Sequence, residues 1–169
     1  VMLSPAALAR VEETTSSSFA LDLKRWLQIM QSYESGSHAY HATMPTDALI
    51  QLRDTMKAME AIGFDVLKAQ QWELGRKVRA MLAAKGIKSV AAPDFAAPGV
   101  VVSHTTDMDI HTGKKFLAQG LQAAAGVPLK CDEPEGFRTF RIGLFGLDKL
   151  QHIDATVADL ESAMTVMTQ

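Results

Sequence analysis

The sequence predicts an α+β fold in which helices cover one face of a small sheet. Up to Gly86 the apolar residues recur every three or four positions, which is typical of amphipathic helices. Beyond Gly86 the pattern changes to extended segments rich in β-branched residues, and a helical stripe closes the chain. With 47% hydrophobic and 21% charged residues in 169, the chain has enough apolar side chains for a folded core.

The first half has the boundary signals of several helices. Ser4 can cap a short helix that begins at Pro5, where the missing N–H costs nothing. Gly63 interrupts a later helix, and Gly86 takes the C-terminal cap position of the longest one. The predicted elements are a helix from 5 to about 11, a mostly helical stretch from 21 that ends before 35, a loop from 34 to 45, a helix from 46, and a helix from 64 to 85.

The second half alternates extended and helical segments. Pro93 and Pro98 mark a turn region between two predicted strands, because proline cannot donate a ladder hydrogen bond. The predicted elements are strands at 87–91 and 99–104, a helix from 109 to 120, a short strand at 121–124, a clear strand at 137–144 and a last helix from 151 to 168. The last helix has Val157, Leu160, Met164 and Met167 on one face.

Charge and composition exclude several classes of protein. The formal net charge of -2 argues against a nucleic-acid partner or an anionic membrane surface, both of which need a basic field. No apolar run approaches the ~20 residues that span a bilayer. The single cysteine, Cys131, cannot form an internal disulfide, so a reducing, cytoplasmic location is expected. Its acidic neighbours would raise the pKa of a nucleophilic thiol, and this favours an inert cysteine.

The strand at 137–144 contains the first candidate for chemistry. Side chains alternate along a strand, so Phe140, Ile142 and Leu144 should share the packed face while Arg141 points the other way. A guanidinium on a rigid strand can hold a carboxylate through two parallel hydrogen bonds. We also expect Gly143 and Gly146 to leave bare backbone beside it, where a ligand could approach closely. A solvated strand arginine is the alternative interpretation.

The loop before the helix at 46 is the second candidate. It presents Tyr40 and Thr43 close to a helix N-terminus, where free N–H groups and the helix dipole favour an anion. His38 and His41 have the spacing of a metal pair. However, a loop would not fix both rings and no third ligand lies nearby, so no metal site is predicted.

Four segments, in order, resemble the C-terminal part of class V, fold type I pyridoxal-phosphate (PLP) aminotransferases of the alanine-glyoxylate and serine-pyruvate type. They are the Leu3-Ser4 start with Ala6, Ala7 and Leu8, the stretch from Ser18 to Trp26, the Tyr40-His41-Ala42-Thr43-Met44-Pro45 loop, and the Phe140-Arg141-Ile142-Gly143 strand. Each motif is weak alone, but the four occur in register over essentially the whole chain.

The resemblance implies a role for each candidate. Arg141 would bind the α-carboxylate of the amino acid or 2-oxo acid. Tyr40 and Thr43 would reach across a homodimer interface to the phosphate of PLP. Residues 1–62 would be the tail of the large cofactor-binding domain, including an interface helix, and residues 63–169 the small C-terminal domain.

The resemblance also implies that part of the machinery lies elsewhere. The Schiff-base lysine of the family lies upstream of the matching region, and none of the lysines here matches it, so no catalytic residue is assigned. Because the chain starts at Val1 in what looks like a strand, we expect it to be the C-terminal part of a longer protein and inactive alone. Trp26, Leu27 and the stripe of Leu49, Leu52 and Met56 should then be exposed.

Other functions stay open at this point. A 2-aminoethylphosphonate transaminase, or another class V transaminase, would share the same motifs. A cysteine desulfurase is disfavoured, because Cys131 lies too near Arg141 and lacks the small-residue neighbours of that family. A stand-alone, non-catalytic α+β module for dimerisation or binding is the alternative from a different class.

Overall fold

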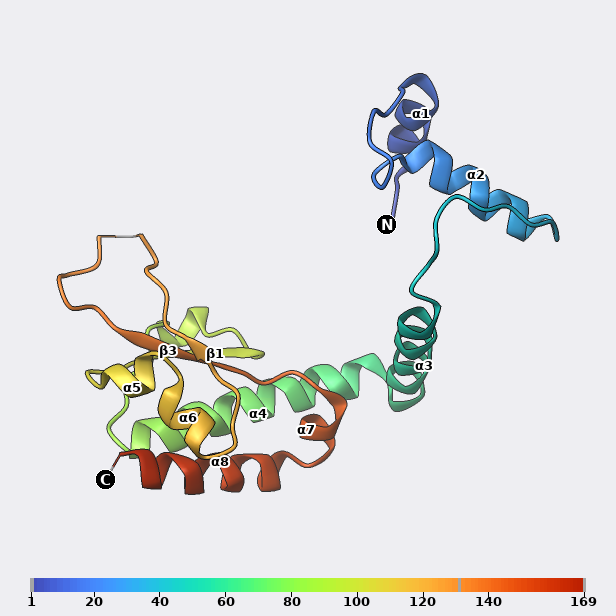
Figure 1. Ribbon diagram of the computed structural model, residues 1–169. Coiled ribbons are helices and arrows are strands. Elements are labelled where there is room, and N and C mark those ends of the chain that lie inside the picture. Colours follow the sequence, from blue (N-terminus) through green and yellow to red (C-terminus); the bar gives the residue numbers. More distant parts are fainter. Residues whose placement is uncertain (1, 131, 169) are drawn as a thin grey trace. The chain divides into compact units, whose positions relative to one another are not determined.

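The computed structural model describes residues 2–130 and 132–168, and the chain divides into two compact units, one up to Arg53 and one from Asp54 onward. The interpretations that rest on Val1 and Cys131 lie outside the described residues. A functional domain boundary at residue 62 remains a prediction. Figure 1 gives the element labels used below.

The N-terminal unit contains helices α1 (Pro5–Glu13) and α2 (Leu23–Glu34) and the start of α3 (Thr46–Ile62). The predicted helices and the loop between α2 and α3 are confirmed. Both early helices are capped by side chains, since Ser4 accepts from the Ala7 N–H at 3.2 Å and Asp22 from the Arg25 N–H at 3.0 Å.

Apolar side chains in this unit and along α3 are largely uncovered. None of the residues of α1, α2 or α3 is fully buried. Leu49, Leu52 and Met56 are 43%, 57% and 59% exposed, as predicted. Trp26 and Leu27 are half-buried instead, and the Trp26 indole N–H donates to the Ala20 carbonyl at 2.9 Å. The exposed apolar area is of the kind that marks an interaction surface.

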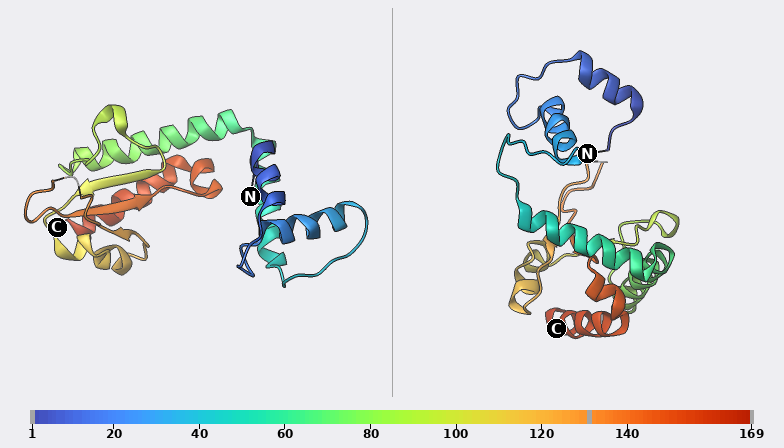
Figure 2. Two further views of the ribbon diagram at one scale, coloured as in Figure 1. Left: turned by 90° about the horizontal axis from the view of Figure 1, so that it is seen from above. Right: turned by 90° about the vertical axis from the view of Figure 1, so that its right-hand side faces the viewer.

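The unit from Asp54 onward holds an antiparallel sheet in the order β1-β3-β2, formed by Val100–His104, Thr139–Gly143 and Ala124–Ala125. Helices α4 (Phe64–Ala84) and α8 (Ile153–Met167) lie side by side on one face of it (Figures 1 and 2). The remaining elements are η1 (Pro93–Phe95), α5 (Met108–His111), α6 (Lys114–Ala118) and α7 (Leu147–Gln151). This α+β architecture is the one predicted.

The core lies between the sheet and these helices. Register pairs Val101 with Ile142 and Ser103 with Phe140, and all four side chains are buried. The helices contribute residues that are at most 1% exposed, and the rings of Phe116 and Phe140 lie 5.4 Å apart. These helical residues are Leu74, Val78 and Leu82 of α4, Phe116 of α6 and Met164 of α8.

Several predicted elements were wrong in detail, and the short strand expected at 121–124 lies at Ala124–Ala125. Residues 87–91 form an isolated bridge from Ser89 to Ser103 and not a strand, because Pro93 starts a 3-10 turn soon after. The helix expected from 109 to 120 is two helices, separated at Gly113, whose φ of 82° is left-handed. Helix α7 was not anticipated. No helix in the described part of the chain is long and apolar enough to cross a membrane.

Candidate functional site

Arg141 lies on the central strand of the sheet. Its neighbours across the ladder are Val102 of β1 and Ala124 of β2, while Phe140 and Ile142 on either side of it are buried against the helices. The alternation therefore places Arg141 on the opposite face, as predicted. Paired strands on both sides hold its backbone in place.

One of the three nitrogens of the Arg141 guanidinium makes a hydrogen bond within the described residues. Its Nε–H donates to the Ala125 carbonyl at 2.9 Å, which fixes the side chain along β2. Among residues 2–130 and 132–168, its two terminal nitrogens have no hydrogen-bond partner. Because these nitrogens can donate to both oxygens of a carboxylate, the group is suited to bind an organic acid.

Gly143 and Gly146 beside Arg141 are both exposed, as predicted for bare backbone. The Phe145 ring lies against Gly143 and Gly99, since a Cβ added to these residues would lie 3.4 Å and 2.8 Å from it. Gly146 has a φ of 119° and is flanked by the Asp148 side chain. Gly146 is thus the residue that precedes α7. A ligand at Gly143 would contact the exposed Phe145 ring.

Tyr40 and Thr43 form a pair of hydroxyl groups in the loop between α2 and α3. Their oxygens are 3.2 Å apart and both residues are exposed. His41 lies between them in sequence and anchors the loop, because its Nε2 contacts the Phe19 carbonyl at 3.0 Å and its ring packs against Phe19 and Trp26. The anchored loop presents two hydroxyl groups together on the protein surface.

His38 and His41 make different contacts. The His38 ring packs edge-on against Tyr33, whereas His41 packs against Phe19 and Trp26. Within the described ranges, no group of three or more His, Cys, Asp and Glu side chains gathers in a way that could hold a metal ion.

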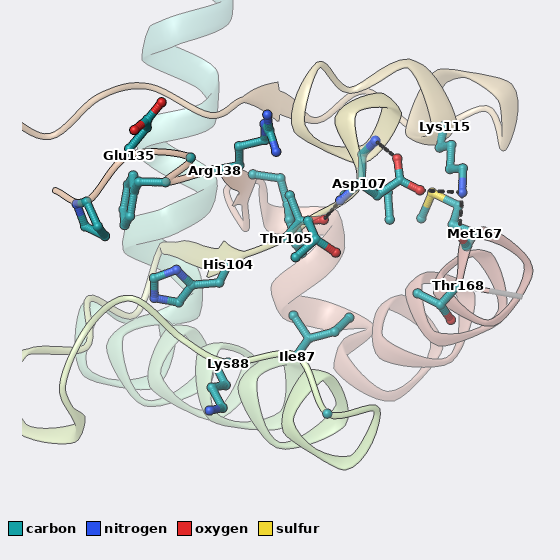
Figure 3. A pocket seen from close by; sticks show the side chains of 17 residues that line it. Ile87, Lys88, His104, Thr105, Asp107, Lys115, Glu135, Arg138, Met167 and Thr168 are labelled. Carbon is teal, nitrogen blue, oxygen red and sulfur yellow. Dashed lines mark hydrogen bonds and ion pairs between the residues drawn. The ribbon is translucent and has the colours of Figure 1, made fainter.

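A carboxylate that the sequence interpretation missed joins three elements of the C-terminal unit. Asp107 accepts hydrogen bonds from the N–H groups of Asp109 and Ile110, at 2.8 Å and 3.0 Å, and so caps α5. Its other oxygen pairs with Lys115 of α6 at 2.8 Å, and Lys115 also donates to the Met167 carbonyl of α8 at 3.0 Å. Figure 3 shows this junction at one side of a pocket of about 740 Å³.

These contacts predict an acid-sensitive junction. The hydrogen bond from Lys115, followed by that from the Ile110 N–H, holds the pKa of the Asp107 carboxyl below its ordinary value. Its stabilising contribution is therefore complete above about pH 5 and is lost as the pH falls through the folded-state pKa. In urea titrations, the difference in unfolding free energy between the wild type and Asp107→Asn should shrink between about pH 5 and pH 2. Asp94→Asn, at an exposed position, should show no such change. A pH-independent difference for Asp107→Asn would contradict the assignment.

The chain shares its α+β fold with part of two aminotransferases of known structure. It matches alanine-glyoxylate aminotransferase from Nostoc sp. with a TM-score of 0.71 at 17% identity, over 96% of this chain and 42% of that one. It matches ureidoglycine-glyoxylate aminotransferase from Bacillus subtilis with a TM-score of 0.67 at 19% identity, over 97% and 41%. The chain thus spans about two fifths of these relatives.

The resemblance inferred from four sequence motifs is confirmed at the level of the fold. A scan against protein-family models and a search of curated proteins found no match to the sequence. At such low identity the likeness concerns the arrangement of the chain, and the roles of individual residues rest on the local geometry described above.

Proposed function

We propose that the chain forms the C-terminal part of a PLP-dependent aminotransferase that transfers an amino group from a small amino acid, alanine or serine, to glyoxylate or pyruvate. One observation carries the proposal: the terminal nitrogens of Arg141 have no hydrogen-bond partner among the described residues, and Arg141 lies on the central strand of a fold shared with two glyoxylate aminotransferases. Upstream residues would supply the Schiff-base lysine. The cytoplasm would be the working compartment.

Arg141 would bind the feature that all these substrates share. Alanine, serine, glyoxylate and pyruvate each carry a carboxylate next to the reacting carbon, so one guanidinium can orient donor and acceptor in turn. The Nε–H bond to Ala125 limits rotation of the side chain, and the remaining two nitrogens form a fork of fixed direction. A preoriented fork reduces the entropy lost on binding, and this would favour a single orientation of the substrate.

Tyr40 and Thr43 fit the phosphate of PLP. Two exposed hydroxyl groups 3.2 Å apart can donate to neighbouring phosphate oxygens. Asp47 in the first turn of α3 carries a charge of the wrong sign for an anion, so the hydroxyl pair, and not the helix dipole, supports the site. We propose that the pair contacts cofactor held by the other subunit of a homodimer. When bound, PLP supplies the electron-withdrawing ring that transamination requires.

The exposed apolar surface supports the same arrangement. The stripe of Leu49, Leu52 and Met56 on α3 is uncovered in this chain. In the proposed enzyme it would pack against the cofactor-binding domain or the partner subunit.

The proposed activity can be tested with the polypeptide that includes the upstream lysine. Alanine and serine should each convert glyoxylate to glycine, and the 169-residue chain alone should give no turnover. A donor screen that finds 2-aminoethylphosphonate as the only substrate would replace the amino-acid donors in this proposal. Absence of transfer from every donor, with PLP bound, would overturn it.

The proposed phosphate contact predicts that loss of the Tyr40 hydroxyl weakens the binding of PLP. Replacing Tyr40 by Phe removes one donor to a charged acceptor, and the dissociation constant for PLP should rise about tenfold in the homodimer. Tyr33→Phe, a change at an exposed tyrosine outside the loop, is the matched control and should leave the dissociation constant unchanged. Equilibrium dialysis measures both, and equal constants for Tyr40→Phe and wild type would refute the phosphate contact.

A further inference from the structure

A second pocket lies in the C-terminal unit, and neither Arg141 nor Asp107 lines it. It has a volume of about 690 Å³, and α4, the segment around residues 86–96 and Ser103 of β1 line it. Its apolar walls include Trp72, Leu82, Ile87 and Pro93. A volume of this size falls in the usual range for small-molecule sites, which are mostly apolar with a few polar groups.

The charge of this pocket is of one sign. Arg76, Arg79 and Lys88 line it, and no aspartate or glutamate is among its described lining residues. This contrasts with the formal net charge of -2 for the whole chain. It also contrasts with the pocket of Figure 3, which shares Gly86, Ile87 and Lys88 with this one but has Asp107 and Glu135 beside its cations.

Arg79 is held at this pocket by backbone carbonyls, and the described residues give it no counter-ion. Its Nη2 donates to the carbonyls of Ala97 and Val100, at 2.7 Å and 2.9 Å. Its Nε is buried and has no partner among the described residues, and burial lowers the pKa of the guanidinium. Neutral carbonyls leave the positive charge uncompensated, so an anion in the pocket would be attracted to it.

Close packing keeps this arrangement in place. A Cβ added to Gly75 would lie 2.6 Å from the Pro98 carbonyl oxygen, so the loop that carries Ala97 runs directly against α4. Gln71 adds hydrogen bonds to the carbonyls of Pro98 and Leu144, both at 3.2 Å. The wall that orients Arg79 is therefore part of the packed fold and not a loose loop.

We propose that this pocket binds a small organic anion, a monocarboxylate with an aromatic or branched aliphatic body. The body would lie against Trp72, which is 40% exposed, and the neighbouring apolar wall. The carboxylate would face Arg76 and Lys88, for which the described residues provide no ion-pair partner. Arg141 does not line the pocket, so the proposal is independent of the aminotransferase function.

Fluorescence of the 169-residue chain can test this proposal. The chain has two tryptophans, so Trp26→Phe leaves Trp72 as the reporter. In this background 4-phenylbutyrate should produce a saturable change, and the neutral analogue 4-phenylbutan-1-ol should bind about tenfold more weakly. Raising NaCl from about 50 to about 500 mM should weaken the binding of the acid and leave the binding of the alcohol unchanged.

Charge variants identify the groups responsible. The double substitution Arg76→Gln and Lys88→Gln should raise the dissociation constant for 4-phenylbutyrate about tenfold. Lys68→Gln, at an exposed position on the same helix outside the pocket, should have no effect. Equal affinity for acid and alcohol would show that the pocket binds the apolar body without recognising the carboxylate, and this would overturn the proposal. So would a lack of saturation, an effect of Lys68→Gln as large as that of the pair, or unchanged binding in the double variant.

Discussion

Arg141→Gln is expected to lower kcat/KM by about 100-fold or more in the proposed aminotransferase, for the amino donor and for the 2-oxo acceptor alike. The reason is that both substrates present a carboxylate to the same fork of two nitrogens, and glutamine offers neither the charge nor the paired geometry. Arg141→Lys should recover little, because an ammonium group cannot make the two parallel bonds. Steady-state kinetics with each substrate varied in turn measures the effect.

A matched control is available three residues away. Arg138 is half-buried, immediately precedes β3 and borders the pocket of Figure 3, which Arg141 does not line. Arg138→Gln should leave kcat/KM within about twofold of the wild type. If Arg141→Gln kept its kcat/KM, or if the two variants lost equal activity, the carboxylate role of Arg141 would be wrong.

Phe140→Ala should destabilise the C-terminal unit by about 3–5 kcal/mol, the largest stability effect we expect. The side chain is 1% exposed and packs between the central strand and α6, with its ring 5.4 Å from that of Phe116. Truncation leaves a cavity that a sheet paired on both sides of β3 cannot close. Urea unfolding followed by circular dichroism measures the loss as a lower midpoint at unchanged slope.

The control for this prediction uses the same substitution on the surface. Phe95 is 83% exposed at the end of η1, so Phe95→Ala should change the free energy of unfolding by less than about 0.5 kcal/mol. A loss below about 1 kcal/mol for Phe140→Ala would show that the sheet and its helices do not share the core described here.

The strand with Arg141 was predictable because its information is local. Alternation of Phe140, Arg141 and Ile142 assigns opposite faces once the segment is extended, and the buried and half-buried positions follow that assignment. The helices before Gly86 were predictable for the same reason. Ser4 and Asp22 each cap an N–H group that lies only three residues further along the chain.

Features that depend on distant residues were not predictable. Phe145 lies against Gly99, a residue far from it in sequence, so the position of this ring beside the exposed Gly143 could not be inferred from the local pattern. Asp107 has a local capping signal, but its bond to Lys115 and the further link to Met167 require α6 and α8 to meet. Residues 87–91 have strand-like composition, yet only Ser89 bridges to β1. Tertiary contacts decide such cases.

We propose that this chain provides the substrate arginine and phosphate contacts of a PLP enzyme whose Schiff-base lysine lies outside the 169 residues. Borohydride reduction in the presence of PLP, followed by peptide mass spectrometry, tests this claim most directly. In the polypeptide that includes the upstream residues, stoichiometric pyridoxyl label should fall on a lysine before Val1, and the 169-residue chain alone should take up no saturable label. Stoichiometric label on a lysine within these residues, lost together with transaminase activity when that lysine is replaced, would contradict the account.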